Sequence, residues 1–192
     1  MGRWARVVAM VALVASGANA LPDEDRLLSL VPWKVLEPGE SVDAPLALFW
    51  IPVSRDDLRR SALLTSNDLT LYAARCVAMR VVRIDDGVRL AGLEVDVAPP
   101  VAVLVDASGN AVGRVESVNG TLSVAAVEEL VRNELDTRAA AADARLDEAR
   151  RLVEEGELDA AAVVYRSVWE ARCVCPRQGK AAQRALRKIA RK

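Results

Sequence analysis

The sequence predicts an α/β domain followed by a smaller, all-α helical extension. As far as residue 135, short apolar segments of strand length alternate with segments of helical periodicity, the order expected of a sheet with helices on both faces. Beyond Asp136 the chain is rich in alanine and only helical patterns remain. The 192 residues, 52% of them hydrophobic, suffice for one ordinary domain with a core and a small annex.

Five segments have the length and composition of strands. The run PLALFWI at 45–51 is apolar throughout, as expected of a strand that is covered on both faces. The turn residues Asp106 to Asn110 join the last two segments as a hairpin. Strands are therefore expected at 33–36, 45–51, 77–84, 101–105 and 111–115.

Helical periodicity occupies the intervals between strands and the whole of the extension. The first helical segment contains Ser66-Asn67-Asp68, which ends one helix and caps the next. Ser123 is expected to cap the last helix of the domain, and Gly156 is expected to end the first helix of the extension. Helices are therefore expected at 56–75, 88–95, 123–135, 137–155, 158–172 and 180–192.

The first 20 residues have the pattern of a secretory signal peptide. Arg3 and Arg6 give a positive start, an apolar run follows, and a small-x-small cleavage site ends at Ala20. The run is about half of the ~20 residues that cross a bilayer, so a cleaved signal is favoured over an uncleaved anchor. The mature chain is expected to be periplasmic or secreted and to contain no membrane span. The expected parts are a signal peptide at 1–20, the α/β domain at 21–135 and the extension at 136–192.

The composition excludes several classes of chemistry. The chain contains no histidine, which excludes Ser-His-Asp and Cys-His catalysis and histidine zinc sites. The formal net charge is −1, and −3 once the two signal-peptide arginines are removed, so no overall field favours nucleic acid or an anionic membrane. No metal site and no cofactor are expected.

Two segments resemble the thioredoxin family. In that family a buried strand ends in a Phe-Trp-x-Pro sequence, and two cysteines spaced by two residues then open a helix; 49–58 (FWIPVSRDDL) resembles this segment. Farther along, 100–110 (PVAVLVDASGN) resembles the family's strand that opens with a cis-proline and continues into a hairpin. Pro100 is the expected cis residue, with Pro99 as the alternative. The resemblance covers 33–135 and implies a thioredoxin-like fold.

The sequence departs from the family at the redox site itself. Ser54 stands in place of the first cysteine and Asp57 in place of the second. Dithiol exchange requires a thiolate, and a serine without a histidine base stays protonated, so neither dithiol chemistry nor Ser-Asp hydrolysis is expected there. Ser54 is better explained as a helix N-cap, with Asp56 and Asp57 in the first turn.

The resemblance implies a contact surface even without the cysteines. Thioredoxin-like domains pair the edge of the cis-proline strand with an extended segment of a partner, a known mode of recognition. The alternative is a former site that is kept only as scaffold. The residues expected to form this surface are Trp50, Val53, Ser54, Ala98, Pro99 and Pro100.

The extension resembles the middle of a tetratricopeptide repeat at Gly156, Ala161 and Tyr165. The resemblance implies a surface for peptides or partner proteins. Only one repeat is visible, so a plain helical hairpin packed on the main domain is the alternative. The segment 171–192 holds eight Lys or Arg and no acid. It is either a contact for anionic lipid or an acidic partner, or a solvated face opposite an apolar stripe, and the second is favoured.

Cys173 and Cys175 form the one motif with redox potential. Cysteines one residue apart form a small, strained and easily reduced disulfide, and Arg172 and Arg177 favour a thiolate. A structural or incidental role is still favoured over a catalytic one. Cys76 is expected to be a buried small hydrophobe, and three cysteines leave three single pairings open.

The function expected from the sequence is that of an exported thioredoxin-like protein that is redox-inactive at the usual site. It would act as a protein- or peptide-binding module, with the extension as a second contact surface. The alternative is a thiol-disulfide oxidoreductase that uses Cys173 and Cys175. The first is favoured because the usual site lacks both cysteines and no other catalytic constellation occurs in the sequence.

Overall fold

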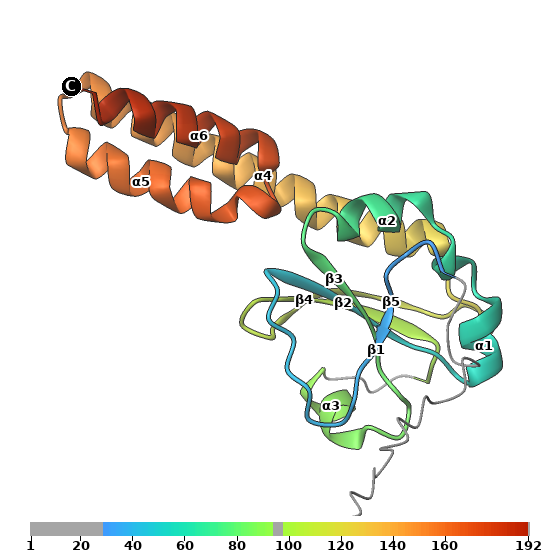
Figure 1. Ribbon diagram of the computed structural model, residues 1–192. Coiled ribbons are helices and arrows are strands. Elements are labelled where there is room, and N and C mark those ends of the chain that lie inside the picture. The colour runs from blue at the N-terminus through green and yellow to red at the C-terminus, as the bar shows by residue number, and fades with distance from the viewer. Residues whose placement is uncertain (1–28, 94–97, 192) are drawn as a thin grey trace, which may run out of the picture.

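The computed structural model describes residues 29–93 and 98–191 and shows an α/β fold with a helical extension (Figure 1). The expected signal peptide and its cleavage site at Ala20 lie outside the described residues. The strands are β1 (Lys34–Val35), β2 (Leu46–Ile51), β3 (Val77–Val81), β4 (Val101–Asp106) and β5 (Ala111–Glu116). The helices are α1 (Arg55–Arg60), α2 (Asn67–Ala73), α3 (Gly87–Gly92), α4 (Val124–Glu154), α5 (Leu158–Glu170) and α6 (Pro176–Ile189), with 3-10 turns η2 (Ala62–Leu64) and η3 (Ala171–Cys173).

The strands form one mixed sheet in the order β1-β3-β2-β4-β5. β1, β3 and β2 are parallel, β4 is antiparallel to β2, and β5 is antiparallel to β4. The expected strands and the expected β4–β5 hairpin are confirmed. β1 is only two residues long, and β3 ends at Val81, before the expected end of that strand.

The central strand β2 is buried at all six positions, which confirms the expectation of a strand covered on both faces. Because successive side chains point to opposite faces of a sheet, β2 contributes to two cores. One core lies under α2 and α4 and the other under α3, and these helices lie on opposite sides of the sheet (Figure 1). The first core receives Leu46, Leu48 and Trp50, and the second receives Ala47, Phe49 and Ile51.

Local sequence explains where the helices of the sheet domain (residues 29–135) begin. α1, α2 and α4 follow Ser54, Ser66 and Ser123, and each hydroxyl accepts a hydrogen bond from the backbone N–H three residues later. Asp86 caps α3 in the same way through its carboxylate. The N-caps expected at the three serines are confirmed.

One helix, α4, belongs to both parts of the molecule. The sequence predicted separate helices at 123–135 and 137–155, but Val124–Glu154 is a single helix of 31 residues. Its length is about 46 Å. The junction between the two expected helices contains no glycine or proline and leads into alanines, so nothing interrupts the helix there. The expected boundary at 135/136 therefore lies inside a continuous helix.

The extension (residues 136–191) is a three-helix bundle that projects away from the sheet (Figure 1). The second half of α4 packs with α5 and α6. Gly156, at φ +84°, ends α4 as expected, since glycine adopts the left-handed conformation without a steric penalty. α6 begins at Pro176, earlier than the expected residue 180.

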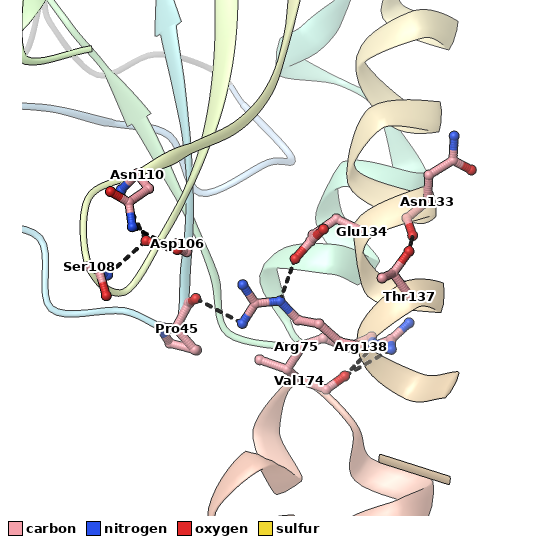
Figure 2. A network of polar contacts seen from close by, with 10 residues as sticks. All are labelled: Pro45, Arg75, Asp106, Ser108, Asn110, Asn133, Glu134, Thr137, Arg138 and Val174. Atoms are coloured by element: carbon pink, nitrogen blue, oxygen red, sulfur yellow. Dashed lines mark hydrogen bonds and ion pairs between the residues drawn. The ribbon is translucent and has the colours of Figure 1, made fainter. Parts of the chain in front are cut away.

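A disulfide bond joins the two parts of the molecule. Cys76, between α2 and β3, is bonded to Cys173 in η3, with the two Cα atoms 5.8 Å apart. The expectation that Cys76 is a buried small hydrophobe was wrong, because its side chain is half-buried and its sulfur is covalently paired. Beside it, Arg75 donates hydrogen bonds of 2.8 and 3.2 Å to the carbonyl oxygen of Val174 (Figure 2).

A second polar contact ties α4 to the edge of the sheet near the same place. Arg138 donates to the carbonyl oxygen of Pro45 at 3.3 Å and to the carboxylate of Glu134 at 2.6 Å (Figure 2). Arg138 lies on α4 just beyond the sheet domain, so α4 is fixed to the domain where it enters the bundle.

Candidate functional site

A groove with a volume of about 1030 Å³ lies beside α1. Three stretches of chain line it: the segment 29–37 that contains β1, the segment 52–59 that leads from β2 into α1, and the loop 81–85 that follows β3. Because β1, β3 and β2 are parallel neighbours, their carboxyl ends bring these stretches to one edge of the sheet.

The wall at the start of α1 is held by Ser54 and Asp57. The Ser54 hydroxyl accepts a hydrogen bond from the Asp57 N–H at 3.1 Å, and the Asp57 carboxylate accepts one from the Val53 N–H at 3.1 Å. The first bond satisfies a backbone donor that the start of a helix leaves without a partner, and the second ties the residue before the N-cap to the first turn. The side chains of Ser54 and Asp57 are therefore both engaged in capping α1.

The apolar part of the groove combines one fixed ring with two exposed aliphatic side chains. Trp33 donates its indole N–H to the carbonyl oxygen of Leu63 at 3.0 Å. Its ring packs edge-to-face on the buried Trp50, with centroids 5.4 Å apart. Val53 and Ile84 are 49% and 51% exposed. Trp33 thus keeps its position while Val53 and Ile84 remain available for contact.

The charges around the groove are of two kinds. Arg83 holds Asp85 through hydrogen bonds of 2.9 and 2.6 Å, and this contact lowers the pKa of the Asp85 carboxyl below its usual value. Arg55 and Arg59 make no hydrogen bond or ion pair with any residue that the structure describes. The groove therefore presents two cations without acidic partners beside its aliphatic side chains, and its lining also holds the acid Glu37, whose charge acts on Arg83.

Of the three contact residues expected at the end of β2, two line the groove and one is buried. Val53 and Ser54 are exposed and line the groove. Trp50 is only 1% exposed and belongs to the core, and its indole nitrogen has no hydrogen-bond partner among the described residues. Trp50 therefore supports the groove through Trp33 instead of contacting a ligand in it.

The other three expected residues open β4. The peptide bond between Pro99 and Pro100 is cis, as expected at Pro100. Pro100 is buried, Pro99 is half-buried and Ala98 is exposed, and none of the three is among the residues that line the groove. Since Val101 pairs with Ile51, this segment nevertheless lies beside the end of β2.

No sequence pattern groups five further residues that line the groove: Trp33, Arg55, Leu58, Arg59 and Ile84. They come from separate segments that only the folded sheet brings together. One weak signal was available: the aliphatic Ile84 stands among charged residues, an unusual place for a side chain expected to be buried.

Cys173 and Cys175 do not form a dithiol in the structure. Cys173 is exposed and bonded to Cys76, whereas Cys175 is buried and free. Burial raises the pKa of the Cys175 thiol above its ordinary value, which suppresses the thiolate that exchange chemistry requires.

A second hollow, with a volume of about 660 Å³, lies beside α3 on the other face of the sheet. Its charged pair is internally satisfied. Arg89 bonds to Asp86 at 3.2 Å and donates to the carbonyl oxygen of Glu40 at 2.6 Å. The other charge in its lining, Asp106, accepts backbone hydrogen bonds from Ser108 and Asn110. Unlike the groove beside α1, this hollow therefore has no unpaired cation among its lining residues.

Within the described residues, no cluster of three or more Cys, Asp or Glu side chains is arranged to hold a metal ion. Over the same residues, no helix combines the length and apolar character that crossing a bilayer requires. No protein-family model matches the sequence, and no curated protein matches it.

Proposed function

We propose that this protein is an exported, thioredoxin-like binding module that holds an extended protein or peptide segment in the groove beside α1, without dithiol chemistry. The thioredoxin-like part rests on the resemblance of 49–58 and 100–110. Two placements support it: β2 leads through Pro52 into α1, and β4, which follows Pro100, is the neighbour of β2. The export part rests on the pattern of residues 1–20.

The observation that carries the proposal is the composition of the groove. Val53 and Ile84 expose aliphatic surface in a concave site, next to Arg55 and Arg59 without acidic partners among the described residues. Exposed apolar surface in a concavity with a few polar groups is typical of a binding site. The complementary ligand is a segment with aliphatic side chains and at least one carboxylate.

The edge strand β1 favours an extended ligand. β1 pairs with β3 on one side, and on its other side no strand of the described part of the chain covers it. An uncovered edge offers backbone donors and acceptors that an extended segment can pair with. Val35 on this strand is itself exposed and also lines the groove.

A random peptide library displayed on phage tests the proposal with the full mature chain. Selected peptides are expected to combine aliphatic and acidic residues. Val53→Glu should weaken their binding by about tenfold or more, equivalent to about 1.4 kcal/mol, because it places a carboxylate in the aliphatic part of the groove. Fluorescence anisotropy of labelled peptides measures the change.

Two matched variants locate the binding. Val88→Glu changes a side chain on α3 that is 89% exposed and outside this groove, and it should leave binding unchanged. Val163→Glu makes the same change on α5, where Val163 is 61% exposed. Peptide binding that is lost with Val163→Glu and kept with Val53→Glu would assign recognition to the extension.

The absence of dithiol chemistry has its own test. The parent protein should not reduce insulin disulfides, whereas Ser54→Cys combined with Asp57→Cys should, because the start of α1 favours a thiolate. The thiol introduced at position 54 should titrate below the free value of about 8.5. Insulin reduction by the parent protein would instead support the oxidoreductase alternative.

A further inference from the structure

We propose that the extension docks this protein onto an anionic lipid surface through one face of α6. Five exposed cations lie on that helix and a sixth follows it: Arg177, Lys180, Arg184, Arg187, Lys188 and Arg191. At 3.6 residues per turn, the five on the helix fall within an arc of about 100°. The opposite side of α6 packs into the bundle through Gln178, Ala182, Ala185, Leu186 and Ile189.

The six side chains have no partners within the described part of the protein. None of them makes a hydrogen bond or an ion pair with a residue that the structure describes. Arg172, just before α6, does have a partner, since its guanidinium lies 4.5 Å from the centre of the Trp169 ring. The cationic face of α6 (the six residues above) is therefore free to neutralise an external anionic surface.

Solvation alone does not require six charges of one sign, as the other two helices of the bundle show. The exposed cations of α4 in the bundle alternate with acids, and two of them, Arg150 and Arg151, pair with Asp147 and Glu155. α5 exposes both Asp159 and Arg166. Among the described residues of α6, by contrast, every charged side chain is a cation, and their mutual repulsion is not offset within the helix.

The two parts of the chain also differ in net charge, and the extension is the positive part. Residues 136–192 contain 13 basic and 9 acidic residues, a net charge of +4. Residues 21–135 contain 11 basic and 18 acidic residues, a net charge of −7. An anionic surface therefore attracts the extension and repels the sheet domain. The bundle projects away from the sheet, so the two parts can take these positions at once (Figure 1).

The form of the cationic face favours a lipid surface over an acidic peptide. Neither the groove beside α1 nor the hollow beside α3 is lined by residues of α6, so neither of them can fix a peptide against its cationic face. α6 also carries none of the large hydrophobic side chains that are exposed in the described residues. Long, unrestrained cations suit a fluid array of headgroups, and binding without apolar insertion is electrostatic and sensitive to salt.

Cosedimentation with vesicles tests this inference on the full mature chain. The protein should bind vesicles of phosphatidylcholine mixed with phosphatidylglycerol and should not bind phosphatidylcholine alone. Each Lys or Arg near such a surface contributes about 1 kcal/mol, or roughly fivefold in affinity. Lys180→Gln, Arg184→Gln and Arg187→Gln together should therefore weaken binding by about 100-fold. Raising the salt from about 0.1 to about 1 M shortens the screening length from roughly 10 to 3 Å and should abolish binding.

A matched triple variant distinguishes the effect of the cationic face of α6 from the effect of the net charge of the protein. Arg145→Gln, Arg150→Gln and Arg151→Gln remove the same three charges from exposed positions of α4 and should weaken vesicle binding much less. Equal losses in the two triple variants would overturn the proposal, as would binding to polyglutamate without binding to the anionic vesicles. Circular dichroism checks that both variants keep the helical content of the parent.

Discussion

The helices of the sheet domain and those of the extension begin in different ways. α1, α2, α3 and α4 each start after a side chain that accepts a hydrogen bond from the first turn. α5 and α6 start after Glu157 and Cys175, and neither side chain caps its helix. The starts in the sheet domain are thus specified by adjacent residues, whereas those in the extension depend on contacts with the rest of the molecule.

The buried side chains of the two parts differ in the same direction. The largest fully buried side chains, Trp50, Leu48 and Leu104 among them, belong to the sheet domain. The extension also buries Leu146, Tyr165, Val168 and Val174, but many of its other buried side chains are alanines, which remove less apolar area from water. They are Ala142, Ala149, Ala161, Ala162 and Ala182. The comparison indicates that the extension relies on its attachment at Cys173 and Val174 more than the sheet domain does.

The largest effect is expected from breaking that attachment. Cys76→Ser with Cys173→Ser removes a bond between residues separated by 97 positions. In the chain-entropy model, loss of such a loop costs about 4.7 kcal/mol of unfolding free energy. Urea unfolding followed by circular dichroism measures this, and the extension should lose its helices at the lower urea concentration.

Cys175→Ser is the matched control, since Cys175 is not part of the disulfide. It should cost much less, and a double variant within about 1 kcal/mol of the parent would contradict the dependence on attachment. A thiol titration checks the pairing itself. Without a reductant, the parent should show one reactive thiol after denaturation and a slower reaction when folded, because Cys175 is buried.

The second effect compares one tryptophan from each part. Trp50→Ala empties the centre of the sheet-domain core and should cost about 4 kcal/mol. Trp169→Ala removes a half-buried ring that stacks with Arg172, and should cost about 2 kcal/mol or less. The same urea experiment measures both. A larger loss for Trp169→Ala would show that the extension has the more important core.

The third effect concerns the close approach of α6 to η3. A Cβ atom added at Gly179 would lie 2.7 Å from the Cα atom of Arg172, so the backbone must shift. Gly179→Ala should therefore cost about 1–3 kcal/mol, although alanine is the better helix former. Gly92→Ala is the control, because the added Cβ at the end of α3 meets no atom within 4 Å and should be neutral or stabilising.

The smallest effects test the helix starts directly. Ser123→Ala removes the hydroxyl that accepts from the Ala126 N–H and should cost about 1 kcal/mol. Glu157→Ser should do the opposite at α5 and stabilise by roughly 0.5–1 kcal/mol, since it supplies a missing cap. Thermal unfolding resolves both shifts. A loss of stability with Glu157→Ser would mean that the start of α5 is already optimal.

The features that could be predicted from the sequence are local. Seven consecutive apolar residues sufficed to place β2, and single hydroxyls sufficed to place the starts of α1, α2 and α4. The start of α6 is also marked locally, since Pro176 occupies the first turn, where proline is favourable, although a start at residue 180 was expected.

Most features that could not be predicted depend on contacts between residues that lie far apart in the sequence. The cysteine spacing left three pairings open, and only the fold shows Cys76 beside Cys173. The groove beside α1 unites Trp33, Val53 and Ile84, which no local pattern connects. The continuity of α4 could not be predicted for another reason. The composition changes at Asp136, which indicates a boundary, but no residue on either side of Asp136 ends a helix.

The bond between Cys76 and Cys173 also closes the chain into a covalent ring that contains β3, α3, β4, β5, α4 and α5. If a protease cuts the backbone once anywhere inside this ring, the ring opens and the molecule still remains in one piece. The two pieces of chain stay covalently joined through the disulfide, so their strands and helices remain next to the elements they pack against. A protein that is exported, as the sequence predicts, would thus tolerate an internal nick that separates into two fragments only after reduction.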